Sequence, residues 1–189
     1  AFMGWKNAHS SLRAQIETAL TNDMGVHARP DGDGEIDAAT LDALGWYVAN
    51  LGVPERRAIA RTGRGRELFG EAGCAACHVP ALITAKHHDE QFSEQLIWPF
   101  TDLMLHDMGP DLAEPGGDAL AAEWRTAPLW GLGVVEERFP ERGFLHDGRA
   151  ASIEEAILWH GGEARAARDA FAQLSASRRA EFLAYVRSL

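Results

Sequence analysis

The sequence is poor in cysteine, in positive charge and in long apolar runs. No stretch of its 189 residues approaches the ~20 apolar residues that a transmembrane helix needs, which argues against a membrane span. The formal net charge of −10 and the lack of clustered Lys and Arg argue against a nucleic-acid partner, because such binding depends on neutralising phosphates. With 46% hydrophobic residues, the chain can still bury the core of a globular protein.

The two cysteines lie in the run Cys74-Ala75-Ala76-Cys77-His78. C-x-x-C-H is the attachment motif of c-type haem, in which the thiols add to the vinyl groups and the imidazole binds the iron. The residues before Cys74 predict a short amphipathic helix that ends at Gly73, a glycine able to take the left-handed conformation. We therefore predict one covalent haem c on Cys74 and Cys77, with His78 as the proximal iron ligand.

Two other functions are compatible with a C-x-x-C pair. A thioredoxin-like dithiol lies beside a βαβ pattern, and no alternating strand pattern flanks this motif. A zinc site would recruit His87 or His88, but structural zinc sites usually have a second matched pair of ligands, and the chain has no further cysteine. Haem attachment remains the favoured interpretation.

The N-terminus lacks the charged-then-apolar layout of a signal peptide. Covalent haem is attached outside the cytoplasm in bacteria. We therefore expect a mature or trimmed form of an exported protein, located in the periplasm.

The periodicity of the apolar residues predicts a mostly α fold: a cytochrome c-like haem domain with long loops, preceded by the helical tail of another domain. Asp37 and Ser152 are the expected N-caps of two helices, and Ser152 forms a capping box with Glu155. No period-2 strand is expected. The expected helices cover residues 10–20, 37–51, 56–72, 152–159 and 175–189.

Residues 80–148 are rich in glycine and proline but keep single aromatic residues. Such a composition predicts long loops packed around a prosthetic group. The aromatic residues are Trp98, Phe100, Trp124, Trp130 and Phe144.

An apolar stripe occurs twice in the chain at one constant offset. Both copies read as the closing helix of a cytochrome c domain, yet only the second follows a C-x-x-C-H motif. The stripe predicts two domains, 1–53 as the tail of an earlier haem domain and 54–189 as the haem domain itself; a chance match between two amphipathic helices is the alternative. The copies are Leu44, Tyr47, Val48 and Leu51, and Phe182, Tyr185, Val186 and Leu189.

Several longer motifs are spread over nearly the whole chain, and together they resemble the C-terminal half of the di-haem oxidoreductases. These are peroxidase-like proteins related to the bacterial di-haem cytochrome c peroxidases and MauG. The resemblance implies a second haem domain or fragment upstream of Ala1, because family members carry two C-x-x-C-H motifs and this chain has one; a shortened relative of the family is the alternative. The motifs lie at residues 4–6, 22–25, 102–109, 123–133, 144–150 and 157–164.

The sixth ligand of the iron has several candidates, and the resemblance separates them. In the related peroxidases an H-x-G turn precedes the distal ligand, often a methionine, by fourteen residues; here His146 precedes His160 by fourteen. The resemblance thus implies His160, with Met108 as the alternative ligand. A helix-end histidine stabilised by the macrodipole would also explain His160. The candidates are Met104, His106, Met108, His146 and His160.

Other residues near these motifs have weaker assignments. Arg125 and Arg149 are candidates for pairing with haem propionates, since a guanidinium matches a carboxylate with two hydrogen bonds; exposed surface arginines are the alternative. His146 is expected to order its own turn. The acidic run Asp31–Asp37 resembles part of a calcium-binding EF-hand loop but lacks the first and last ligands.

These predictions leave three functions open. The first is the electron-transfer haem of a di-haem oxidoreductase, with bis-histidine ligation and a redox partner protein still to be identified, because two axial protein ligands leave no open position for peroxide. The second is a stand-alone electron carrier. The third is a mono-haem peroxidase with an open distal face and Glu114 or His106 as general acid and base.

Overall fold

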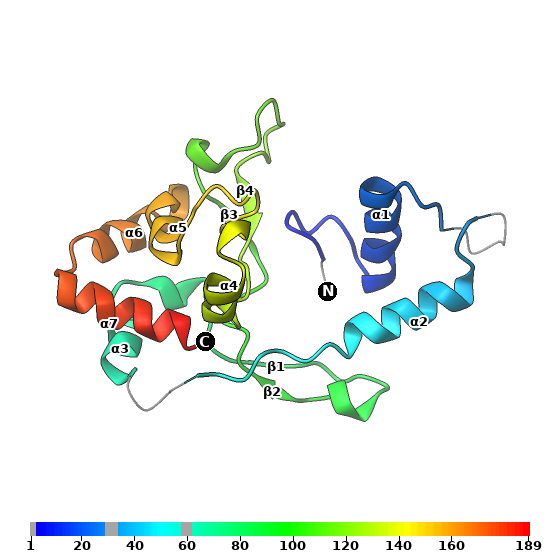
Figure 1. Cartoon of the computed structure of the whole chain (residues 1–189), viewed down its shortest axis with the longest axis horizontal. Helices are drawn as coiled ribbons and strands as arrows, with labels where there is room; N and C mark the ends of the chain where they lie inside the picture. Colours follow the sequence, from blue (N-terminus) through cyan, green and yellow to red (C-terminus); the bar gives the residue numbers. More distant parts are fainter. Residues whose placement is uncertain (1–2, 29–33, 58–61) are drawn as a thin grey trace. The chain divides into compact units, whose positions relative to one another are not determined.

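The computed structural model describes residues 3–28, 34–57 and 62–189. The chain forms two compact units, unit 1 (Ala1–Val53) and unit 2 (Pro54–Leu189). The described residues form mainly helices, with two small sheets, which confirms the predicted mostly α fold (Figure 1). Within those ranges, no helix is both long enough and apolar enough to cross a bilayer.

Unit 1 contains the helices α1 (Leu12–Met24) and α2 (Ala38–Ala49). The Asp37 side chain accepts a hydrogen bond from the backbone of Thr40 at 2.8 Å, so the predicted N-cap of α2 is confirmed. The two helices share a small core. It consists of the buried residues Ile16, Leu20 and Leu41, with Leu12, Val26, Ala28, Ile36, Leu44 and Val48 packed against them.

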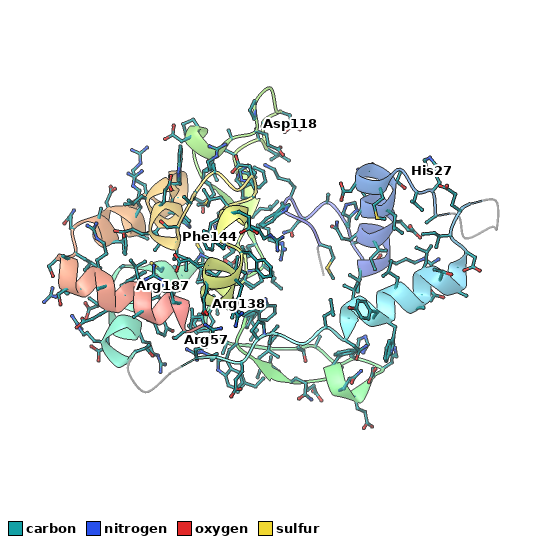
Figure 2. The ribbon with its side chains drawn as sticks, in the orientation of Figure 1. His27, Arg57, Asp118, Arg138, Phe144 and Arg187 are labelled. Atoms are coloured by element: carbon teal, nitrogen blue, oxygen red, sulfur yellow. The ribbon has the colours of Figure 1, made fainter. Side chains whose placement is uncertain are left out.

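The core of unit 2 forms where α3 (Gly63–Glu71) packs against α7 (Ala176–Arg187). Gly65 permits this contact, because a Cβ atom there would lie 2.3 Å from the carbonyl oxygen of Glu181. Phe144, labelled in Figure 2, packs against the same core. The buried residues of the core are Leu68, Phe69, Ala72, Phe100, Ile153, Phe171, Phe182, Leu183, Tyr185, Val186 and Leu189.

Two helices of unit 2 were not predicted, namely α4 (Leu132–Arg138) and α6 (Arg165–Ala172). The glutamates of α4 bind neighbouring arginines: Glu136 pairs with Arg187 and Glu137 with Arg57. Both arginines are labelled in Figure 2. Helix α5 (Ile153–Trp159) begins at the predicted cap. The Ser152 hydroxyl accepts a hydrogen bond from the Glu155 backbone at 3.1 Å.

The expectation of no strands is wrong. Strand β1 (Leu82–Ile83) pairs antiparallel with β2 (Leu96–Ile97), and β3 (Leu105–Asp107) pairs antiparallel with β4 (Glu123–Arg125). Strands of two or three residues are too short to show a period of two in the sequence. Five short 3₁₀ helices complete the described part of unit 2: η2 (Cys74–Ala76), η3 (Glu90–Phe92), η4 (Pro110–Leu112), η5 (Pro140–Arg142) and η6 (Gly162–Ala164).

The predicted helix over 56–72 is wrong at its start. Residues 54–57 are not helical, and the backbone of Arg57 instead donates a hydrogen bond to the carbonyl of Ser188 at 3.0 Å. Residues 58–61 lie outside the described ranges. In the loop region, Phe100 and Trp124 are buried as expected, whereas Trp98 is 52% exposed.

Candidate haem site

The two cysteines follow the end of α3. Gly73 has φ of +85°, which confirms the expected left-handed turn; η2 then begins at Cys74, and Cys77 caps its C-terminal end. The cysteines form no disulfide. Burial raises the pKa of the Cys74 thiol to about 11, and burial together with the charges of Asp102 and Glu163 raises the pKa of Cys77. A redox dithiol needs a lowered thiol pKa, so these values oppose the thioredoxin-like alternative.

His78 is held by the backbone of a loop far along the chain. Its Nδ1 lies 3.0 Å from the carbonyl oxygen of Phe100, so Nδ1 carries the proton and Nε2 keeps a free lone pair. Phe100 is 2% exposed and has φ of +54°, a conformation that costs energy for a bulky residue and that its packing must maintain. Burial lowers the pKa of His78 to about 4, which keeps the imidazole neutral at pH 7.

His160 lies at the C-terminal end of α5 and is held in the same manner. Its Nδ1 lies 2.8 Å from the carbonyl oxygen of Ala156, one helical turn earlier. Burial lowers its pKa as well, so the ring is a neutral imidazole with Nε2 available. The fold brings the two imidazoles close together: the ring centroids of His78 and His160 are 6.5 Å apart, and the ring planes differ by 48°.

The other candidates for the sixth ligand lie differently. His106 has both ring nitrogens within 2.9 Å of carboxylate oxygens, and Met104 is 60% exposed. His146 stacks on Trp124, with ring centroids 3.6 Å apart, in agreement with a structural role. Met108 lies with its carbonyl against Gly161, next to His160.

The two arginines chosen as propionate partners differ in their surroundings. Arg149 donates to the side chain of Asp147 and to the carbonyl of Asp111, each at 2.6 Å, and its guanidinium lies over the ring of Trp159. Much of its donor capacity is therefore used within the loop. Arg125 lies in β4, and burial lowers its pKa.

Among the residues that the structure describes, the group able to hold a metal ion without haem is Cys77, Asp102 and His106. The predicted zinc partners His87 and His88 are exposed and stack on each other, with centroids 4.1 Å apart. Zinc binding would need a free imidazole lone pair on His106, whose two nitrogens are both bound by carboxylates.

Part of the acidic run Asp31–Asp37 lies outside the described residues, which exclude 29–33. The described part uses its carboxylates locally: Glu35 accepts a hydrogen bond from the backbone of His27 at 3.0 Å, and Asp37 caps α2. Calcium binding, which the sequence supports only weakly, stays untested.

Sequence reasoning missed four groups around the two histidines. The carbonyls of Phe100 and Ala156 are main-chain atoms, which every residue type has, so the sequence does not indicate their role. Asp102 and Glu163 lie inside the motifs that carry the resemblance, but the sequence does not predict that their carboxylates bind His106.

Residues 27–189 match the model of the family described as "Di-haem oxidoreductase, putative peroxidase". The chain belongs to the di-haem oxidoreductase family. The match covers all of unit 2 and about half of unit 1, and it includes both His78 and His160. Searches of curated proteins and of solved structures found no match. Membership of this family confirms the predicted resemblance to the di-haem oxidoreductases. That the chain corresponds to their C-terminal half stays a prediction.

Proposed function

We propose that unit 2 of this di-haem oxidoreductase carries one haem c, bound through thioethers from Cys74 and Cys77, and that this haem transfers electrons. His78 would hold the iron on the proximal side and His160 on the distal side. When bound, the haem supplies a one-electron iron couple whose potential depends on these axial ligands.

The observation that carries this proposal is the separation of the two imidazoles. With bonds of about 1.35 Å, each atom of a five-membered ring lies about 1.1 Å from its centre. If both Nε2 atoms bound one metal ion from opposite sides at about 2.0–2.1 Å, the centroids would lie about 6.4 Å apart, close to the observed 6.5 Å. The spacing of His78 and His160 therefore fits one metal ion held between them.

The protonation of the site agrees with this fit. An axial imidazole must be neutral, and burial lowers the pKa of both histidines. Each Nδ1 is bound by a backbone carbonyl, so each ring is fixed in the tautomer that presents Nε2. This chain's residues thus select the ligating atom and orient it.

The place of His160 favours electron transfer over peroxide chemistry at this haem. A mono-haem peroxidase needs an open distal face, and an imidazole opposite His78 would fill that face. Of its proposed acid–base groups, His106 already binds two carboxylates. Bis-histidine ligation would also give a lower potential than histidine–methionine ligation, since thioether sulfur favours reduced iron.

We further propose that a second haem domain precedes unit 1 and that a redox partner protein exchanges electrons with the two haems. We also propose that the protein works in the periplasm. The family's di-haem character supports the second haem. Kinship with the di-haem cytochrome c peroxidases and MauG belongs to the same proposal.

The test is the spin state of the purified, haem-loaded protein, compared with its H160A and M108A variants. We expect a covalent haem by intact mass and a low-spin ferric EPR spectrum for the wild type and for M108A, and a high-spin spectrum for H160A. H87A, which changes an exposed histidine, is the matched control. A low-spin spectrum in H160A together with a high-spin one in M108A would assign the distal position to Met108 instead.

A further inference from the structure

A bridge of three charged side chains lies beside Cys77. His106 contacts Asp102 through Nε2 at 2.8 Å and Glu163 through Nδ1 at 2.9 Å. Carboxylate oxygens accept hydrogen bonds, so both nitrogens of His106 donate and the ring is an imidazolium. Asp102 and His106 are 14% and 18% exposed, whereas Glu163 is 57% exposed. We call these three residues the carboxylate bridge.

One end of the bridge is anchored to the proximal side of the site. Asp102 follows Phe100, whose carbonyl binds His78, by two residues. Between them, Thr101 is fully buried; its backbone donates to the carbonyl of Val79 at 3.1 Å. Asp102 thus follows directly on a segment that contacts the proximal ligand His78 and the residue after it.

The other end belongs to the distal side. Glu163 follows His160 by three residues, and its second carboxylate oxygen accepts a hydrogen bond from the backbone of Asp107 at 3.2 Å. The bridge therefore ties the segment after the distal histidine to β3, and through Asp102 to the proximal loop.

The same two segments approach backbone to backbone through glycines. A Cβ atom on Gly162 would lie 2.1 Å from the carbonyl of Asp107, and one on Gly161 would lie 2.7 Å from that of Met108. Glycines bring no side chains to this contact. The Glu163 carboxylate supplies a polar side-chain tie that can hold the glycine-rich turn in place.

We propose that His106 is a positioning residue, which keeps His160 opposite His78 by clamping the turn after His160 through Glu163. The inference rests on the proposed bis-histidine haem. Loss of the bridge frees residues 160–163 to move away from β3, so the distal imidazole spends more time detached from the iron.

The experiment measures cyanide binding to the ferric, haem-loaded full chain in the H106Q and E163Q variants. Cyanide needs an open distal position, so its binding rate reports the fraction of protein with His160 detached. Because Glu163 is largely exposed, its hydrogen bond to His106 is worth about fivefold in such an equilibrium, and we expect cyanide to bind about fivefold faster in both variants. Because the three side chains act as one unit, the double variant should be no faster than the faster single variant.

Two matched controls remove similar groups elsewhere. H87Q changes an exposed histidine. E137Q removes a carboxylate of α4 that pairs with Arg57. Both variants should bind cyanide at the wild-type rate. Hydrogen exchange of residues 160–164 gives a readout independent of the haem, and it should speed up in H106Q and E163Q alone. E163Q, at an exposed position, keeps the test valid if H106Q fails to fold.

The outcomes separate this inference from the proposed function. A high-spin wild type would refute the bis-histidine haem itself. A low-spin wild type whose H106Q and E163Q variants bind cyanide and exchange hydrogen at wild-type rates would refute the positioning role and leave the haem assignment intact.

Discussion

Helices α2 and α7 carry the same apolar stripe, but they bury it to different degrees. Tyr185 of α7 is 3% exposed, whereas the corresponding Tyr47 of α2 is 58% exposed. Leu189, just beyond α7, is likewise 3% exposed, and its counterpart Leu51 is 56% exposed. A stripe in the sequence thus predicts a helix correctly in both units, while its burial depends on what packs against it.

The partner of α7 explains the difference. Tyr185 packs edge-on against Phe69 of α3, with centroids 5.6 Å apart, and against Phe100 at 6.3 Å. In unit 1, Leu44 and Val48 pack into the small core shared with α1, and Tyr47 and Leu51 stay at the surface. That unit 1 is the tail of an earlier haem domain stays a prediction.

The largest expected effect comes from truncating the two tyrosines. Replacing a buried aromatic residue by alanine costs about 3–5 kcal/mol, so Y185A should lose that much unfolding free energy. Y47A should change it by less than about 0.5 kcal/mol, as at other surface positions. Urea unfolding of the haem-loaded chain measures both. Equal losses would show that Tyr47 is buried in solution.

A second test addresses the close approach of α3 and α7. The Cβ atom introduced by G65A would meet Glu181 and Tyr185, and overpacking of this kind costs about 1–3 kcal/mol. G70A, in the same helix, meets nothing within 4 Å and should stabilise the protein by up to about 1 kcal/mol, because alanine favours helix. Thermal unfolding distinguishes them, and a neutral G65A would show that the two helices can move apart.

The smallest effect is a pH dependence confined to unit 2, which contains the carboxylate bridge. Burial lowers the pKa of His106, but the hydrogen bonds to Glu163 and Asp102 outweigh burial and the pKa is raised. The bridge therefore stabilises unit 2 fully below the unfolded pKa of about 6.5, and this contribution disappears as pH rises through the raised folded pKa.

Because Glu163 is largely exposed, we expect this contribution to be at most about 1 kcal/mol. Urea unfolding between pH 6 and pH 9 measures it, with H106Q expected to show a flatter profile and H87Q the wild-type one. A wild-type profile that does not fall over this range would contradict the assigned imidazolium.

The sequence predicted the helices with clear caps or stripes, among them α2, α5 and α7, because capping and periodicity are local properties. It did not predict α4 and α6, which lack a side-chain N-cap, or the two small sheets, whose strands are too short to leave a periodic signal. Of the candidate site, the cysteines and His78 follow from their spacing, and His160 from the family resemblance. The acceptors on Phe100 and Ala156 depend on tertiary structure and have no sequence signature.

These two acceptors have a consequence for how the protein tolerates change over evolution. Because they are main-chain oxygens, no side-chain replacement at position 100 or 156 deletes them. The orientation of both imidazoles can therefore persist while neighbouring side chains drift, provided that the local backbone path is kept. Variation among relatives at these two positions would then report on packing, and would be a poor guide to how the iron ligands are held.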